Sequence, residues 1–164
     1  MVLDLKSIFA NEGESLKLET EFDFSEVDVY GIFPLQAPVS VSGTVLNRAG
    51  VVTLSLVLRA VYAAPCDRCG VDTEQELVVD VDRILVSRLE NDDNEEYIIL
   101  SDMSLDLREL CYTEVVLRLP TKHLCRADCK GLCAKCGTNL NEGDCGCPKQ
   151  EIDPRLEALK ALLD

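Results

Sequence analysis

Tryptophan is absent from this chain of 164 residues, histidine occurs once, and aromatic residues make up 5% of the sequence. The chain has no nucleophile motif and no glycine-rich phosphate-binding loop, so it lacks the parts of a recognisable active site. We therefore expect that it is not an enzyme. No run of about 18 apolar residues occurs, and we expect no segment that spans a membrane.

Positive charge is also scarce. The chain has 16 lysines and arginines against 30 acidic residues, which gives a formal net charge of −14. This balance excludes binding to nucleic acid through a generally basic surface, and it suits either solubility alone or a basic protein partner. The N-terminus lacks the basic start and apolar run of an export signal. We expect a cytoplasmic monomer.

Cysteine, in contrast, is abundant, with nine residues, six of them between positions 125 and 147. An odd number cannot be fully paired in disulfides, and cysteine clusters in a reducing compartment are more often metal ligands. A tetrahedral metal site takes four sulfurs. Six cysteines do not fill two such sites, so two further ligands are expected elsewhere in the chain.

Two Cys-x-x-Cys-Gly motifs occur, at residues 66–70 and 133–137. Two intervening residues let both sulfurs face one ion, and the glycine lets the turn close tightly. Two further close pairs complete two structural sites, each expected to hold one Zn²⁺ through four cysteines. The eight predicted ligands are Cys66, Cys69, Cys125, Cys129, Cys133, Cys136, Cys145 and Cys147.

The division of these cysteines between the two sites can be argued from loop closure. Only eight residues separate Cys136 from Cys145, and a short loop closes with a smaller loss of chain entropy than a long one. We therefore predict one local site made by the last four cysteines. The first Cys-x-x-Cys pair then joins Cys125 and Cys129. An alternative that joins the first pair to Cys145 and Cys147 stays open.

Other interpretations of the cysteines also stay open. Four thiolates can hold an iron–sulfur cluster. Cys66 and Cys69 can form a redox-active dithiol, because Arg68 between them would lower a thiol pKa. Cys111 lies in an apolar stripe and is interpreted as a small core residue. His123 is interpreted as a residue of a surface loop rather than as a ligand.

The first half of the chain is predicted to be rich in β-strands. Alternating apolar and polar residues predict strands at residues 15–24, 38–62 and 75–87. The middle stretch predicts two strands around a tight turn at residues 47–50. Because no long helix separates these segments, we expect antiparallel strands in a small barrel or sandwich.

One helix is predicted at about residues 106–118. Asp106 and Glu109 have the spacing of a capping box at its start, and Pro120 is expected to end it. Glu114 lies near the apolar stripe of this helix. A buried acid is one interpretation of this position, but we expect Glu114 at the edge of the stripe, in contact with water.

Near the end of the chain, Asp153 and Pro154 are typical of the start of a helix. The leucines that follow predict a short amphipathic helix. The architecture expected for the whole chain is α+β. It consists of a β-rich domain with one packed helix at residues 1–120, a cysteine-rich, zinc-ribbon-like segment at residues 121–150, and a short C-terminal helix at residues 151–164.

Three stretches of the chain, APCDRCG, GLCAKCGTNLN and IDPRLEALKALL, resemble the YceD family, the large ribosomal RNA subunit accumulation proteins. The resemblance implies a bacterial or organellar factor that is needed for normal accumulation of large-subunit (23S) rRNA, and hence for ribosome assembly. It also implies a protein that is not an enzyme. Cys111 is not part of the family's motif and is not expected to be a ligand.

Two functions are therefore considered. The first is an rRNA-accumulation factor that acts through a basic ribosomal protein or a ribosome assembly factor. Direct RNA contact is an option within it, limited to phosphates because no aromatic residues lie nearby for base stacking. The alternative is a zinc-reservoir or thiol-redox-sensing protein without a ribosomal role. The basic residues available for RNA contact are Arg126, Lys130, Lys135 and Lys149.

Overall fold

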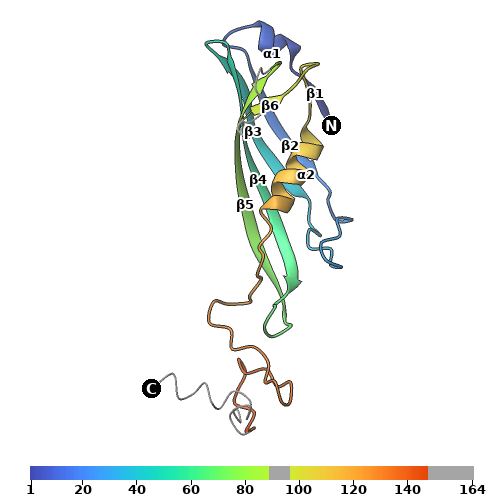
Figure 1. The fold of residues 1–164 in the computed structure, drawn as a ribbon, viewed down its shortest axis with the longest axis vertical. Coiled ribbons are helices and arrows are strands. Elements are labelled where there is room, and N and C mark those ends of the chain that lie inside the picture. The colour runs from blue at the N-terminus through green and yellow to red at the C-terminus, as the bar shows by residue number, and fades with distance from the viewer. Residues whose placement is uncertain (89–96, 148–164) are drawn as a thin grey trace, which may run out of the picture.

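The computed structural model describes residues 1–88 and 97–147, so the terminal helix expected at residues 151–164 lies outside the described residues. Its main feature is a five-stranded sheet in the order β2-β3-β4-β5-β6 (Figure 1). The elements are β1 (Val2–Asp4), α1 (Lys6–Ala10), β2 (Ser15–Phe22), β3 (Val39–Arg48), β4 (Val51–Pro65), β5 (Asp72–Val86), β6 (Tyr97–Ile99), β7 (Ser104–Asp106) and α2 (Leu107–Leu117).

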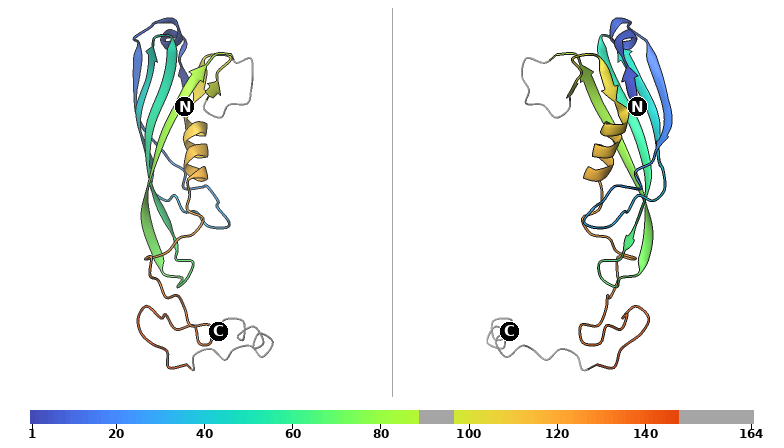
Figure 2. Two further views of the ribbon diagram at one scale, coloured as in Figure 1. Left: turned by 60° about the vertical axis from the view of Figure 1, so that its left-hand side comes forward. Right: turned by 90° about the vertical axis from the view of Figure 1, so that its right-hand side faces the viewer.

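The sheet is open rather than closed. Strands β2 to β5 pair as an antiparallel meander, but β6 pairs with β5 in parallel, and β1 pairs with β7 in a separate two-stranded sheet. The predicted barrel or sandwich is therefore wrong, whereas the antiparallel pairing predicted for the strands at residues 15–24, 38–62 and 75–87 is confirmed. One face of the main sheet is apolar, and α2 covers it (Figure 2). A single covering layer suffices for one apolar face, so no second sheet is required.

The tight turn predicted between β3 and β4 is confirmed. Ala49 and Gly50 both have positive φ, 53° and 80°, as a two-residue hairpin turn requires. Asn47 supports the turn, because its Oδ1 accepts a hydrogen bond from the Gly50 N–H at 3.1 Å. Its Nδ2 donates to the Ile8 carbonyl at 2.7 Å. The same side chain thus stabilises the turn and holds α1 against it.

The hairpin of β4 and β5 is long and regular. Its register runs without a bulge from Val52 opposite Leu85 to Pro65 opposite Asp72. The tip of this hairpin, residues 66–71, contains the first Cys-x-x-Cys motif. Figure 1 shows that the tip lies at the end of the sheet opposite α1, beside the cysteine-rich segment. The length of the hairpin is what brings the first two cysteines to the others.

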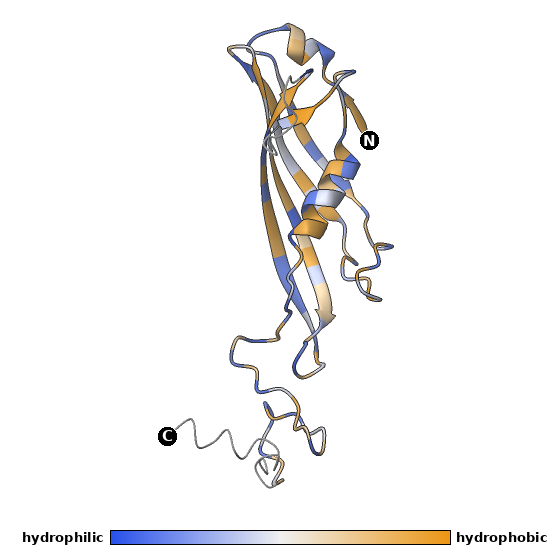
Figure 3. Cartoon of the chain, viewed as in Figure 1, coloured by the Kyte–Doolittle hydropathy of each residue, from blue (hydrophilic) through white to orange (hydrophobic). Residues whose placement is uncertain are grey.

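The core lies between the apolar face of the sheet and α2. Leu54 and Leu58 from β4 are fully buried, as are Cys111 and Val115 from α2. Hydrophobic and hydrophilic residues alternate along the strands (Figure 3), as expected for a sheet with one buried face. Cys111 is confirmed as a core residue, and burial raises the pKa of its thiol to about 12.

Helix α2 begins as predicted. The Asp106 side chain accepts hydrogen bonds from the backbone N–H groups of Arg108 and Glu109, at 3.0 and 3.3 Å. The expectation that Glu114 reaches water is wrong. Its side chain is only 9% exposed, and it accepts a hydrogen bond from Arg83 of β5 at 2.6 Å. The buried carboxylate is tolerated because an arginine on the covered face of the sheet pairs with it.

No helix within residues 1–88 and 97–147 is long and apolar enough to cross a membrane.

Candidate metal centres

The eight predicted ligands form two groups of four thiols, and within each group every Sγ lies within 4.8 Å of the others. The structure thus brings the thiols together in the division predicted from loop closure, and not in the alternative division. The proximal group is Cys66, Cys69, Cys125 and Cys129, and the distal group is Cys133, Cys136, Cys145 and Cys147.

The separations between sulfurs fit a tetrahedral metal site. A zinc–thiolate bond of about 2.3 Å places the four sulfurs about 3.8 Å apart, far more than the ~2.05 Å of a disulfide. In the proximal group, the Cys66 and Cys129 sulfurs are 3.8 Å apart, and the Cys69 and Cys125 sulfurs are 3.6 Å apart. Each group is therefore close enough to bind one metal ion. That the ion is zinc stays a prediction.

The two Cys-x-x-Cys-Gly motifs fold into the same turn. In each, the N–H of the first cysteine donates to the carbonyl of the residue after the glycine, at 2.9 and 2.8 Å, and the glycine N–H donates back to the first cysteine at 2.8 Å. Gly70 and Gly137 have φ values of 71° and 74°, which other residues rarely adopt. The turn directs both sulfurs of each motif to the same side.

Hydrogen bonds join the hairpin tip to the tail, here defined as residues 118–147, around the proximal group. The Asp67 N–H donates to the His123 carbonyl at 2.9 Å, and the His123 N–H donates to the Asp67 carboxylate at 2.7 Å. Arg68 Nη1 donates to the Cys129 carbonyl at 2.7 Å, and the Leu132 N–H donates to the Arg68 carbonyl at 3.2 Å. The two residues between the first cysteines thus hold the tail in place.

The interpretation of His123 as a surface residue is wrong. Its side chain is 3% exposed and packs edge-on against the Tyr62 ring, with centroids 4.9 Å apart. Nε2 lies 3.3 Å from the Thr73 carbonyl, and because a carbonyl can only accept, Nε2 is the donor. The imidazole belongs to neither group of thiols. The pairing of the tail with the tip buries it, and no sequence pattern indicated that pairing.

The proximal thiols differ in how readily they ionise. Backbone N–H groups, foremost that of Cys125, donate to Cys66 and lower the pKa of its thiol to about 6. At Cys125 itself, desolvation of the thiol and the neighbouring sulfurs raise the pKa to about 12. Four thiolates at this distance repel one another. A divalent cation would offset that repulsion, and this is the condition under which all four sulfurs become ligands.

The distal group is more open to solvent. Cys136 is exposed and the other three cysteines are half-buried, whereas three of the four proximal cysteines are buried. Thr138 Oγ1 lies 3.2 Å from Cys136 Sγ, and this hydrogen bond is the main reason that the pKa of Cys136 is lowered to about 6. Contacts with the Cys136 and Cys145 sulfurs raise the pKa of Cys147 to about 12. In both groups, hydrogen bonds and neighbouring sulfurs lower the pKa of some thiols and raise that of others, but the distal thiols are less buried.

Asn141 connects the two groups, although it lies in the loop of the distal one. Its Nδ2 donates to Cys129 Sγ at 3.3 Å, and its Oδ1 accepts from the Lys130 N–H and from Arg126 Nη2, both at 2.8 Å. Burial opposes ionisation of Cys129, but the Asn141 amide and the Gly131 N–H hold the pKa of this thiol below its usual value. No spacing pattern in the sequence indicated this contact.

The basic residues considered for RNA contact have different surroundings. Arg126 is engaged locally, because its Nε lies 3.4 Å from the Asp128 carboxylate, in addition to its bond to Asn141. Lys130 and Lys135 are exposed. Lys149 lies outside the described residues. Arg126 therefore makes structural contacts within the tail. RNA binding stays a prediction.

The similarity to known proteins covers different shares of their length. A protein of Arabidopsis thaliana, "Large ribosomal RNA subunit accumulation protein YCED homolog 1, chloroplastic", is 26% identical over 155 residues, which cover 74% of this chain and 47% of that protein. An uncharacterized protein of Mycobacterium leprae is 40% identical over 62 residues, 38% of this chain and 28% of that protein. The chain thus spans less than half the length of these two. No solved structure matches the chain.

A third relative is covered more completely. The uncharacterized protein YlbN of Bacillus subtilis is 24% identical over 132 residues, which cover 77% of this chain and 75% of that protein. The family model described as "Large ribosomal RNA subunit accumulation protein YceD" matches residues 54–163. That span covers more than half of the chain and includes both groups of thiols. The chain belongs to the YceD family.

Proposed function

We propose that this protein is a non-enzymatic factor that supports accumulation of large-subunit (23S) rRNA and ribosome assembly, with two structural zinc sites. Membership of a family named for that role is the observation that carries the proposal. The arrangement of the cysteines supports it, because closed sites of four thiolates are structural rather than catalytic. Bound zinc would supply a cross-link between parts of the chain that have little apolar core of their own.

The residues around the proximal group suit a structural role. Asp67 and Arg68 hold the tail by hydrogen bonds even apart from the thiols, and His123 fills the space between tail and sheet. The sulfurs need only remain ionised and aligned to complete the connection. In the distal group, Thr138 and the backbone of the turn orient the sulfurs in the same way.

Depletion of the protein tests the proposal directly. We expect depleted cells to contain less mature 23S rRNA and a smaller large-subunit peak on a sucrose gradient. Wild-type protein should restore both, whereas Cys66→Ser should not. Cys111→Ala is the matched control, because it removes a cysteine that belongs to neither group. An unchanged subunit profile after depletion would contradict the proposal.

A basic ribosomal protein or assembly factor is the proposed partner, since a net charge of −14 favours a basic protein over RNA. A pull-down with the full chain, performed with and without nuclease, separates the two classes. Retention of the same basic protein after nuclease treatment supports the proposal. Loss of all bound protein after nuclease would show that RNA mediates the contact.

Exposure of Cys136 favours a second candidate, a zinc-reservoir or thiol-redox-sensing protein. Zinc in an exposed thiolate site is more accessible to oxidants than zinc in a buried site. Counting zinc per chain after mild oxidation discriminates the two functions. Retention of both ions supports the structural role, whereas ready and reversible loss together with normal rRNA levels supports the alternative.

A further inference from the structure

Among the described residues, strand β5 has one unpaired edge over most of its length. Its 15 residues pair with β4 on one side, but β6 pairs only with Ile84–Val86 on the other. No other strand in residues 1–88 and 97–147 pairs with β5 below that point. In Figure 1, β5 forms the border of the sheet from β6 down to the hairpin tip.

The backbone groups that point to this edge can be identified. The Val86 carbonyl accepts a hydrogen bond from the Leu100 N–H at 2.8 Å, on the side away from β4. In an antiparallel ladder, alternate residues direct both backbone groups to the same side. Counting back from Val86, the residues that face the free edge are Asp82, Asp80, Val78, Glu76 and Glu74. Arg83 Nη1 already donates to the Asp82 carbonyl at 3.1 Å, so the open stretch is Glu74 to Asp80.

Natural proteins usually protect such an edge with charged side chains, above all lysine, or with a proline, a bulge or a covering segment. Between Glu74 and Asp80, β5 contains neither proline nor lysine, and its register has no bulge. The opposite edge of the sheet, β2, is shorter and has Lys17 on its uncovered face. The charges between Glu74 and Asp80 are all acidic, so they oppose an acidic strand, and the edge of β5 is the better template for a basic one.

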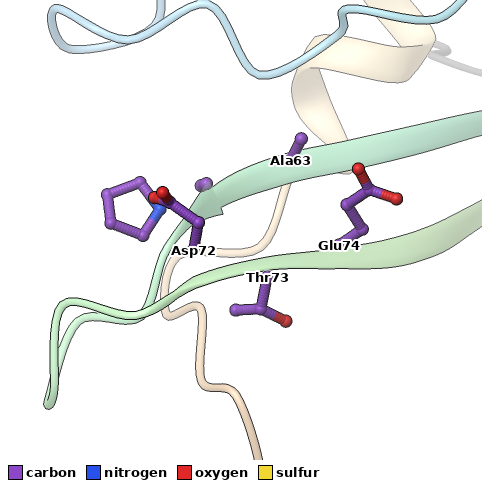
Figure 4. A pocket seen from close by; sticks show the side chains of 6 residues that line it. Ala63, Asp72, Thr73 and Glu74 are labelled. Carbon is purple, nitrogen blue, oxygen red and sulfur yellow. The ribbon is translucent and has the colours of Figure 1, made fainter.

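The charges along β5 select what can be added. Asp72, Glu74, Glu76, Asp80 and Asp82 are exposed on the face away from α2. Figure 4 shows this alternation at the lower end of the strand, where Asp72 and Glu74 lie on one side and Thr73 on the other. Glu76 is paired with Arg59 at 3.3 Å, whereas Glu74 and Asp80 have no ion pair among the described residues. A second copy of this acidic strand would be repelled.

We propose that the edge of β5 from Glu74 to Asp80 binds an extended, basic segment of a protein partner as an additional β-strand. The proposal rests on the proposed function for the ribosomal origin of that partner, and it specifies the surface that the partner uses. Strand addition supplies backbone hydrogen bonds, while side chains provide the selectivity.

The side chains of the added strand follow from the two faces of β5. On the uncovered face, lysine or arginine at alternate positions lies beside the carboxylates. On the covered face, the neighbours are Leu77, half-buried against the core, and Val79, which is fully buried. Apolar or small residues fit there. The recognised segment thus alternates basic residues with apolar or small ones.

A synthetic peptide that alternates lysine with valine or threonine tests this proposal against the full chain. We expect saturable binding that weakens as the salt concentration is raised, because the carboxylates of β5 are exposed and their attraction to the peptide is screened. Amide exchange measured by NMR should show new protection at the N–H groups of Glu76, Val78 and Asp80. The N–H groups of Leu77 and Val79 already bond to β4 and should change little.

Backbone chemistry and charge can be separated with matched probes. A peptide of the same sequence with alternate backbone nitrogens methylated keeps its charge but cannot complete the ladder, so it should bind much more weakly. The variant Glu74→Lys/Asp80→Lys should weaken binding roughly tenfold, as expected for two reversed exposed charges. Its control, Glu19→Lys/Glu21→Lys, makes the same charge change on β2 and should leave binding almost unchanged.

Three results would overturn the proposal: equal binding of the methylated peptide, protection on β2 instead of β5, or a dimer of the chain that the peptide displaces. These measurements use no ribosomal readout, so they are independent of the depletion experiment. Normal 23S rRNA after depletion together with strand addition at β5 would remove the proposed function and leave the binding edge. Reduced 23S rRNA after depletion, without protection at β5, would support the proposed function and remove the binding edge.

Discussion

The proximal and distal groups of thiols have the same ligands and the same turn, yet they differ in what they connect. The proximal sulfurs join positions that are 56 and 63 residues apart in the chain. All four distal cysteines lie between residues 133 and 147. A cross-link over a long loop restricts the unfolded chain more than one over a short loop. The same ligand chemistry can therefore stabilise a tertiary contact in one place and order a single loop in another.

The hydrogen bonds around the two groups of thiols differ in the same way. Around the proximal group, the tip and the tail exchange hydrogen bonds through Asp67, Arg68 and His123. The distal group has the hydrogen bonds of its own turn and the contact of Asn141 with Cys129. Loss of the proximal group should therefore be felt in the β4–β5 hairpin, and loss of the distal group mainly in its own loop.

The largest expected effect is the difference in stability between a variant that lacks one proximal ligand and a variant that lacks one distal ligand. Cys66→Ser should lower Tm by roughly 5–10 °C, as expected for a loss of about 2–3 kcal/mol, because it removes the cross-link between tail and hairpin and leaves only the hydrogen bonds of the tip. Amide exchange should increase at the tip and at residues 121–132. Cys133→Ser should leave Tm almost unchanged and increase exchange only at residues 131–147. Increased exchange in the same region for both variants would contradict the comparison.

A smaller effect is expected on the pH at which each site, loaded with the proposed zinc ion, releases it. Asn141→Ala removes a hydrogen bond to the Cys129 thiolate, so the pKa of Cys129 rises and protons compete with zinc at higher pH. The midpoint of proximal release should move up by roughly 0.5 to 1 pH unit. Thr138→Val removes the bond that lowers the pKa of Cys136 and should shift the distal step instead. Titration of released zinc with a chromogenic chelator measures both steps.

If both variants moved the same step, the two groups would not act as separate sites. Loss of a hydrogen bond that stabilises a thiolate should raise the release pH. A downward shift of the release pH in either variant would therefore contradict the role assigned to its hydrogen bond.

The smallest effect is expected from two glycines with nearly the same backbone. Gly131 and Gly137 have φ values of 75° and 74°, so alanine at either position costs about 1–2 kcal/mol. At Gly131 the added Cβ would also lie 3.0 Å from the Arg68 carbonyl, whereas at Gly137 no atom lies within 4 Å. Gly131→Ala should therefore weaken proximal zinc binding more than Gly137→Ala weakens distal binding. Competition with a chelator measures both, and equal losses would show that the approach to Arg68 is unimportant.

Much of the site could be predicted because it depends on short spacings. The Cys-x-x-Cys-Gly motifs contain the turn that directs two sulfurs to one side, and a loop of eight residues between Cys136 and Cys145 favours a local group. The turn between β3 and β4 and the N-cap of α2 at Asp106 were predicted for the same reason. Each depends on residues only a few positions apart.

The errors, in contrast, concern residues whose neighbours are distant in the chain. Glu114 is buried because Arg83 lies opposite it on the sheet, and His123 is buried because the tail crosses the hairpin near Tyr62. Asn141 contacts Cys129 across the boundary between the two groups. None of these pairings has a spacing pattern that sequence reasoning could recognise.

Local chemistry therefore settled that the ligand cysteines come in close pairs, where the turns lie and where α2 begins, since steric and entropic constraints over a few residues depend on residue type and spacing alone. Long-range packing settled how the pairs of cysteines combine into two groups, that strands β2 to β6 form one open sheet instead of a barrel, and that a carboxylate and an imidazole are buried. It also settled that, among the described residues, no strand pairs with β5 below β6. Burial and pairing depend on which surfaces meet when the chain folds, and the residues on those surfaces are far apart in the sequence.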